Sequence, residues 1–232
     1  MMRAFFSRTG TRTTLSATKR ARWGMLISAA GVWRTEGFDV WVGDNGAWTD
    51  HMQGRPFDIK RFVRFVGWIC AQIRAGNPPH WIALPDIVMG GIGSLDLSVR
   101  WLRWLRNVPE LADQRFMLVV QNGMEACAAT LTRLRRIVGP MVGIFVGGDT
   151  DWKLRTMGFW RAFTHMLGAI LHVGRVNSAR RIEACGKISA DSFDGSSVSR
   201  FPKTLKELER ARYGAVLAQS QIDIEDYLRE AA

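Results

Sequence analysis

The sequence lacks the patterns that identify several common classes of protein. No apolar run reaches the roughly 18 residues that a membrane-spanning helix needs, so we expect no membrane partner. The three cysteines include no CxxC pair and the four histidines show no HExxH spacing, so neither a disulfide framework nor a metal site is indicated. GxGxxG, GxxxxGK[ST] and GxSxG patterns are missing too, which argues against a dinucleotide site, a P-loop and a hydrolase nucleophile elbow. We expect no cofactor, and the cysteine usage suits a reducing cytoplasm.

The charge of the chain is strongly one-sided. Lysine and arginine number 32 against 21 acidic residues, a net charge of +11, and 47% hydrophobic residues in 232 are enough for one sizeable core. This surplus favours a polyanionic partner, and ten tryptophans are available to stack on bases. Arg100, Arg103 and Arg106 recur at every third position, and we assign them with Lys153 and Arg200 to a nucleic-acid surface. The alternative for such a run is a solvated helix face.

The N-terminal region carries charge of one sign only. Its first 35 residues contain seven basic residues and no acid, and they are rich in serine and threonine. We interpret residues 1–37 as a basic arm that binds phosphate and leads into a first strand. A targeting sequence, with GMLISAAGVW as its apolar part, is the alternative.

Beyond this region, short apolar runs alternate with amphipathic segments. Runs too short for a typical helix, several of them ending in glycine-bearing turns, predict buried strands at 38–46, 80–88, 115–123, 141–149, 169–177 and 189–195. Helical spacing predicts helices at 58–74, 94–107, 125–138, 152–167 and 178–186. We expect residues 38–203 to form the catalytic core, with 204–232 as a charged helix packed on its outside.

This alternation predicts an α/β fold with a parallel sheet, either an open doubly wound sheet or a barrel. Polar residues end nearly every predicted strand, among them Asp44, Asp86 and Gln121. Barrel active sites are built from strand ends around the whole ring, whereas an open sheet concentrates its site at one crevice. We therefore predict a contracted (β/α) barrel of the TIM type.

Three aspartates are candidates for the chemistry. Asp191 and Asp194 lie in DSFDG at the end of the last predicted strand, and Asp44 lies between glycines in WVGDNGAW. A carboxylate facing a second acid can attack an anomeric carbon and form a covalent sugar ester. We take Asp194 as the nucleophile, Asp191 as its substitute and Asp44 as the second acid, although turn capping would also explain aspartates in DSFDG.

Further polar residues at strand ends could hold a substrate. Asp86 in LPDIVMGG can accept from an N–H and an amino group at once, which is the edge that a guanine-like base presents. Gln121 in VVQNG offers a donor and an acceptor, and the amides of Gly147 and Gly148 are free to approach a flat ligand. The remaining substrate-binding candidates come from HVGRVNS and are His172, Arg175 and Asn177. A satisfied core histidine is the alternative for the first of these.

The ordered motifs WVGDNGAW, LPDIVMGG, VVQNG, FVGGDTDWK, HVGRVNS and DSFDG resemble the tRNA-guanine transglycosylase superfamily. They are most similar to its DNA-modifying branch, the DpdA-like DNA-guanine transglycosylases of phages and genomic islands. The resemblance covers roughly residues 38–200 and implies a (β/α) barrel that exchanges guanine for a 7-deazaguanine, such as the 7-cyano form, without breaking the strand.

Carried onto this sequence residue by residue, the resemblance implies a nucleophile at Asp194 and a second acid at Asp44, where DNGA replaces the family's D-S-G-G. It also implies a base pocket formed by Asp86, Gln121 and the glycines of FVGGD. The family's zinc site after the nucleophile has no counterpart, because no cysteine or histidine follows Cys185. The short chain and the missing zinc subdomain favour DNA over tRNA. Action on RNA, and a non-catalytic nucleic-acid-binding barrel, are the two alternatives.

Overall fold

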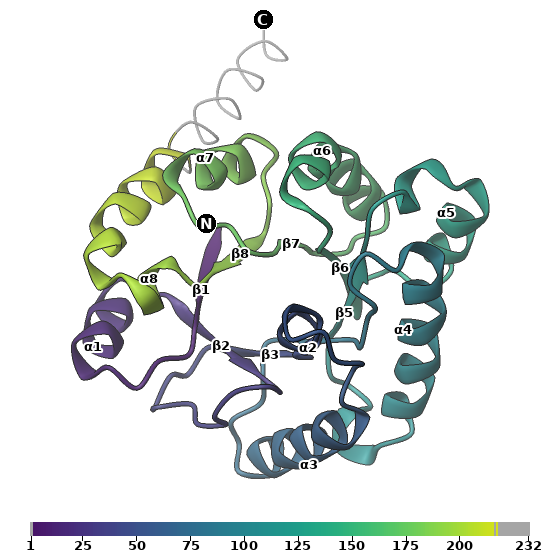
Figure 1. The fold of residues 1–232 in the computed structure, drawn as a ribbon, viewed down its shortest axis with the longest axis horizontal. Coiled ribbons are helices and arrows are strands. Elements are labelled where there is room, and N and C mark those ends of the chain that lie inside the picture. Colours follow the sequence, from purple (N-terminus) through teal and green to yellow (C-terminus); the bar gives the residue numbers. More distant parts are fainter. Residues whose placement is uncertain (1, 216, 218–232) are drawn as a thin grey trace, which may run out of the picture.

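A computed structural model of the chain describes residues 2–215 and 217. It is a closed barrel of parallel strands in the order β1 to β8, with β8 paired to β1, so the predicted (β/α) barrel is confirmed (Figure 1). The strands are β1 (Arg3–Ser7), β2 (Gly24–Ser28), β3 (Trp41–Asp44), β4 (Ile82–Ala83), β5 (Phe116–Val120), β6 (Val142–Val146), β7 (Leu171–Val173) and β8 (Ser192–Gly195).

Helices follow the strands and surround the ring (Figure 1). They are α1 (Arg12–Arg20), α2 (Ala47–Met52), α3 (Ile59–Arg74), α4 (Gly91–Arg106), α5 (Ala128–Arg135), α6 (Thr150–Met166), α7 (Ala179–Lys187) and the single turn α8 (Ser197–Arg200). Three short 3₁₀ turns complete the elements at Pro109–Leu111, Met124–Ala126 and Pro202–Thr204. Each of the five helices predicted from spacing is present. In Figure 1, α2 is drawn over the ring instead of outside it.

The strands divide their side chains between two cores because successive residues point to opposite faces. Along β1, Phe5 belongs to a small cluster inside the barrel, while Ala4 and Phe6 belong to the large core between strands and helices. The interior cluster consists of Phe5, Leu26, Val42, Trp81, Ala83 and Met117. Side chains therefore fill the barrel, and any cavity for a ligand lies at one of its ends.

Helix α3 shows how the local sequence defines an outer helix. Asp58 caps its first turn by accepting a hydrogen bond from the amide of Arg61 at 2.9 Å. Phe62, Phe65 and Ile69 recur at helical spacing and are fully buried against the strands. Replacing Asp58 by alanine would remove the cap and destabilise the protein by about 1 kcal/mol.

The prediction that residues 1–37 form an arm ahead of the barrel is wrong, although the strand region predicted there is present. Residues 3–7 and 24–28 form β1 and β2, which are joined by α1, so the barrel begins near residue 3 instead of residue 38. The apolar centre of β1, Ala4 to Phe6, is fully buried, although basic residues flank it. With these two strands added to the six predicted ones, the ring is a full eight-stranded barrel in a short chain.

The C-terminal segment packs on the outside as far as the structure describes it. Residues 205–215 are helical, and Leu208, Ala211 and Ala215 are buried. Arg212 is buried too and donates to the carbonyl of Ala21 at 3.0 Å. The rest of the predicted helix at 204–232, apart from residue 217, lies outside the described residues. Within the described ranges, no helix is long and apolar enough to span a membrane.

Candidate active site

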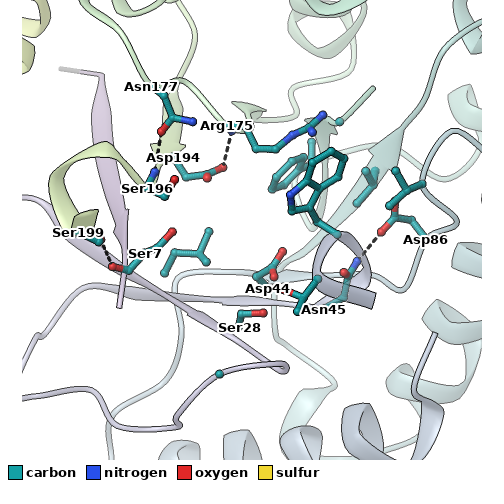
Figure 2. Close-up of a pocket in the computed structure, with 18 of the residues that line it drawn as sticks. Ser7, Ser28, Asp44, Asn45, Asp86, Arg175, Asn177, Asp194, Ser196 and Ser199 are labelled. Atoms are coloured by element: carbon teal, nitrogen blue, oxygen red, sulfur yellow. Dashed lines mark hydrogen bonds between the residues drawn. The ribbon is translucent and has the colours of Figure 1, made fainter. Parts of the chain in front are cut away.

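A cavity of about 640 Å³ opens at the carboxyl end of the strands. Three of the predicted acids line it together: Asp44 from the end of β3, Asp86 from the loop after β4, and Asp194 from β8 (Figure 2). The acids come from strands on different sides of the ring, as expected for a barrel site. The cavity is large enough for a nucleotide-sized ligand.

Asp194 is held by one of its two carboxylate oxygens. Its Oδ1 accepts from the backbone amide of Arg175 at 3.3 Å and lies 2.9 Å from Nε2 of His172. No hydrogen bond to its Oδ2 is found among the described residues, and the side chain lines the cavity. Oδ2 is therefore the oxygen available to react.

His172 lies beneath this carboxylate inside the barrel. Its ring is fully buried, with centroids 4.7 Å from Trp81 and 4.6 Å from Phe145, and its Nδ1 is 2.9 Å from the hydroxyl of Ser192. Burial lowers the pKa of His172, so the ring is neutral, and the hydrogen bond to Asp194 opposes that shift. A carboxylate oxygen only accepts, so Nε2 carries the proton and Nδ1 accepts from Ser192. The prediction that His172 lines the pocket is wrong; it positions Asp194 from below.

Asp44 titrates in the range where catalytic acids and bases work. Burial raises its pKa to about 6, the negative charge of Asp194 adds to the rise, and hydrogen bonds from Ser28 and the Gly46 amide oppose it. The amide of Gly46 donates to Oδ2 of Asp44 at 3.1 Å. Gly46 has a φ of +82° and leaves no room for a side chain, because a Cβ would come within 3.0 Å of the Ala30 amide nitrogen.

Asp86 and Gln121 form one hydrogen-bonded unit with Asn45. Asp86 accepts from Nδ2 of Asn45 at 2.7 Å and from Nε2 of Gln121 at 2.6 Å. Burial raises the pKa of Asp86 to about 7, with the charge of Asp44 adding to the rise and both amide hydrogen bonds opposing it. The sequence predicted that Asp86 and Gln121 share a site, and they do lie together. Asn45 was missed, although its place beside Asp44 was a signal for it.

Gly147 and Gly148 line the cavity, but their amides are not free for a ligand. The amide of Gly147 donates to the carbonyl of Val120 at 3.0 Å, and that of Gly148 donates to Oε1 of Gln121 at 3.2 Å. A Cβ on Gly148, whose φ is +43°, would lie 2.2 Å from the ring of Trp152. The predicted amide contacts to a ligand are therefore wrong in this structure. These glycines allow the chain to pass close to Gln121 and Trp152.

Arg175 and Trp48 both line the cavity and contact each other there. The guanidinium of Arg175 lies 3.8 Å from the centroid of the Trp48 ring and also donates to the carbonyl of Gly148. Trp48 is 42% exposed, and its flat ring lines the same cavity as the acids. Trp48 was not identified as a site residue from the sequence. Asn177 also lines the cavity, where its Oδ1 accepts from the amides of Ser196 and Ser197 at 2.7 and 3.1 Å.

Asp191 is not a substitute nucleophile. It precedes β8 at the amino end of the barrel, where its carboxylate accepts from Arg161 at 2.9 Å and from the amide of Leu171 at 2.7 Å. In a parallel strand of four residues, Asp191 and Asp194 fall at opposite ends of the ring. The prediction for Asp191 is therefore wrong.

Most of the predicted nucleic-acid-binding residues also lie elsewhere. Lys153 is buried, donates to the carbonyl of Gly174, and has its pKa lowered to about 7 by burial and by the charge of Arg175. Arg106 donates to backbone carbonyls ahead of β5 and β6 at the amino end. The assignment of Lys153 is therefore wrong, and that of Arg106 stays a prediction, although its side chain is engaged away from the cavity. Arg100 and Arg103 are exposed on α4 and do not line the cavity, whereas Arg200 does.

Comparison with protein-family models gives no match for the chain, and comparison with curated proteins gives none either. Within the part of the chain that the structure describes, no three histidine, cysteine, aspartate or glutamate side chains are grouped as metal ligands. The fold and the cavity are therefore the basis for any functional assignment.

Proposed function

We propose that the protein exchanges guanine in DNA for a 7-deazaguanine through a covalent aspartyl–sugar intermediate. The observation that carries the proposal is the pairing of two carboxylates in one cavity. Asp194 is fixed by one oxygen with the other free, and Asp44 faces the same cavity with a pKa near 6. A double displacement at an anomeric carbon uses two carboxyl groups in one cavity, one as nucleophile and one as acid and base.

The base-binding residues fit a purine in this proposal. Asp86 keeps acceptor capacity beyond its two amide partners, so it can receive the N–H and amino group of a guanine edge. Trp48 lines the same cavity and is exposed, so a base can stack on the part of its ring that Arg175 does not cover. A base in a duplex cannot reach such a cavity, so the target nucleotide has to leave the stack.

In the first displacement, Oδ2 of Asp194 attacks C1′ while the bond from C1′ to N9 of guanine breaks. The electron pair of that bond goes to the leaving base, which takes a proton from Asp44. The hydrogen bonds to Oδ1 remain, and Oδ1 becomes the carbonyl oxygen of the ester.

In the second displacement, ionised Asp44 removes the N9 proton of the incoming 7-deazaguanine. N9 then attacks C1′, the ester bond breaks, and its electron pair returns to Asp194. No electron is gained or lost, and the configuration at C1′ is retained after two inversions. A pKa near 6 lets Asp44 serve as acid in one step and base in the other.

The test is incorporation of labelled 7-cyano-7-deazaguanine into polymer. The purified protein is incubated with the labelled base and single-stranded DNA, duplex DNA or RNA of the same sequence. We expect label in DNA with the wild type and with Asp191→Asn, and none with Asp194→Asn. Label in RNA alone would show that RNA, not DNA, is the substrate. No label in any polymer, with folded wild-type protein, would contradict the proposal and favour a binding protein.

A further inference from the structure

The rim of the cavity is divided into two sectors of different chemistry. On the β3–β5 side it is acidic and amide-rich, with Asp44, Asn45, Asp86 and Gln121. On the side of β7, β8 and β1 it is basic and rich in hydroxyls, and we call this side the basic sector. Its members are Ser7, Arg8, Arg175, Asn177, Arg181, Ser196, Ser199 and Arg200, and all of them line the cavity.

The basic sector is continuous because β8 pairs with both of its neighbours, β7 and β1. The hydroxyl of Ser199, in α8, donates to the carbonyl of Ser7, at the end of β1. Figure 2 shows Ser7, Ser196 and Ser199 on the side of Asp194, with Asp86 on the opposite side. Asp194 is the one acid of the cavity that lies on this side.

Two arginines of the basic sector have no polar side-chain partner among the described residues. Arg181, in α7, and Arg200, in α8, make no ion pair or side-chain hydrogen bond with any residue that the structure describes. By contrast, Arg8 pairs with Glu36, and Arg175 stacks on Trp48. Even Arg8 keeps a buried Nε without a hydrogen-bond partner. Arginine guanidinium groups near the hydroxyls of Ser7 and Ser196 are suited to the oxygens of a phosphate group.

The order of groups across the cavity matches the covalent order of a nucleotide. The acid and amide sector suits a base, Asp44 and Asp194 would face the anomeric carbon, and Arg181 and Arg200 come from α7 and α8, on the side of Asp194. We propose that the basic sector binds the phosphodiesters that flank the target nucleotide, so that the substrate is a strand crossing the rim over β7, β8 and β1. This inference rests on the proposed function for the position of the sugar.

The test measures binding without turnover, in the Asp194→Asn background. Fluorescence anisotropy follows a labelled single-stranded oligodeoxynucleotide with one guanine, and the same sequence as RNA. Adding Arg181→Gln or Arg200→Gln should weaken binding of the DNA by about 5- to 10-fold each and lower the salt slope by about one. Arg100→Gln and Arg103→Gln, exposed on α4 with the same charge change, are the matched controls and should leave the affinity within about twofold.

A second arm locates the contact on the strand. A methylphosphonate replaces one linkage beside the guanine and removes the charge of that phosphate alone. If Arg200 contacts this phosphate, the losses from Arg200→Gln and from the methylphosphonate will not add, whereas the losses from Arg100→Gln and the methylphosphonate will add. Equal losses for the Arg200 and Arg100 variants, or full additivity at both flanking linkages, would overturn the inference.

The outcomes separate this inference from the proposed function. If binding depends on Arg181 and Arg200 but the wild type exchanges no base, the phosphate site is supported and the transglycosylase activity is rejected. If exchange is as fast on free deoxyguanosine as on the oligonucleotide, the phosphate site is rejected and the proposed base exchange is supported. Arginine-dependent binding to RNA only would keep the site and assign it to an RNA strand.

Discussion

Asp194 and Asp191 lie three residues apart around one strand, at opposite ends of the barrel. Asp191 is held at Oδ2 by Arg161 and by the Leu171 amide at the amino end of the barrel, so its charge is paired within the fold and away from the cavity. Asp194 keeps one oxygen free above a buried histidine and beside a cavity. The same residue type thus stabilises one end and is available for chemistry at the other.

The contrast extends to the other charged side chains. At the amino end, Arg106 donates to three backbone carbonyls and Arg74 pairs with Glu110 at 2.6 Å. At the carboxyl end, Asp86 is buried and Asp44 is half-buried, both with raised pKa values, and Arg181 lines the cavity without a partner among the described residues. Fewer stabilising interactions are thus made at the end of the barrel that holds the cavity, a distribution expected of a functional site.

The largest expected effect is a loss of base exchange that occurs in Asp194→Asn but not in Asp191→Asn. Asp194→Asn should lower base exchange by about 10³-fold or more and abolish the covalent DNA–protein adduct, because an amide is no nucleophile at C1′. Asp191→Asn should retain both activities and lose about 1 kcal/mol of stability or less, since its ion pair is partly exposed. Denaturing gels of protein incubated with DNA measure the adduct. An adduct that persists in Asp194→Asn and disappears in Asp191→Asn would reverse the assignment.

A smaller loss is expected from the residue beneath the nucleophile. His172→Phe removes the donor to Oδ1 and should lower exchange by about 10- to 100-fold, the worth of a buried hydrogen bond to a charged group. Without that donor the carboxylate is a poorer leaving group, so the adduct should accumulate as its breakdown slows more than its formation. His172→Gln, which keeps a donor, should recover part of the rate. Equal slowing of both steps would indicate a merely structural role.

At the cavity, removing a charge should stabilise the protein. Burial raises the pKa of Asp44 in the folded state, so its stability contribution is present below the unfolded value and is lost as the pH rises through about 6. Asp44→Asn should therefore raise the free energy of unfolding at pH 8 by about 2 kcal/mol, with little change near pH 3. Urea titrations at both pH values measure this difference. A destabilised variant at pH 8 would contradict the electrostatic account, and Asp191→Asn should change stability in the opposite direction.

The smallest effect is expected at the amino end. Arg106→Gln removes donors to the carbonyls of Ala112, Gln114 and Met141 and should lower the free energy of unfolding by about 1 kcal/mol. Its binding to DNA should keep the wild-type salt slope, measured by anisotropy, because it lies away from the cavity. If the salt slope of DNA binding falls by about one in this variant, Arg106 belongs to the nucleic-acid surface after all.

The sequence predicted more of the fold than of the site. Six apolar runs were found because a buried parallel strand is apolar throughout, as in Phe116–Val120. The strand at Arg3–Ser7 was missed because its buried centre is only three residues long and the surrounding charge dominates the pattern. The sequence DSFDG around β8 also does not show which of its two aspartates lies at the cavity end of the strand. For this reason the prediction for Asp191 was wrong. The roles of Trp48 and Arg181 depend on packing between distant loops, which spacing along the chain does not record.

Closure of the ring has a consequence for synthesis of the protein on the ribosome. Of the strands that the structure describes, β8 is the last to be made, and it pairs with β1, the first. Asp194 lies on β8, so a nascent chain that stops short of this strand has neither a closed barrel nor the Asp194 carboxylate at the cavity. Translation thus adds Asp194 only after most of the residues that line the cavity have been made.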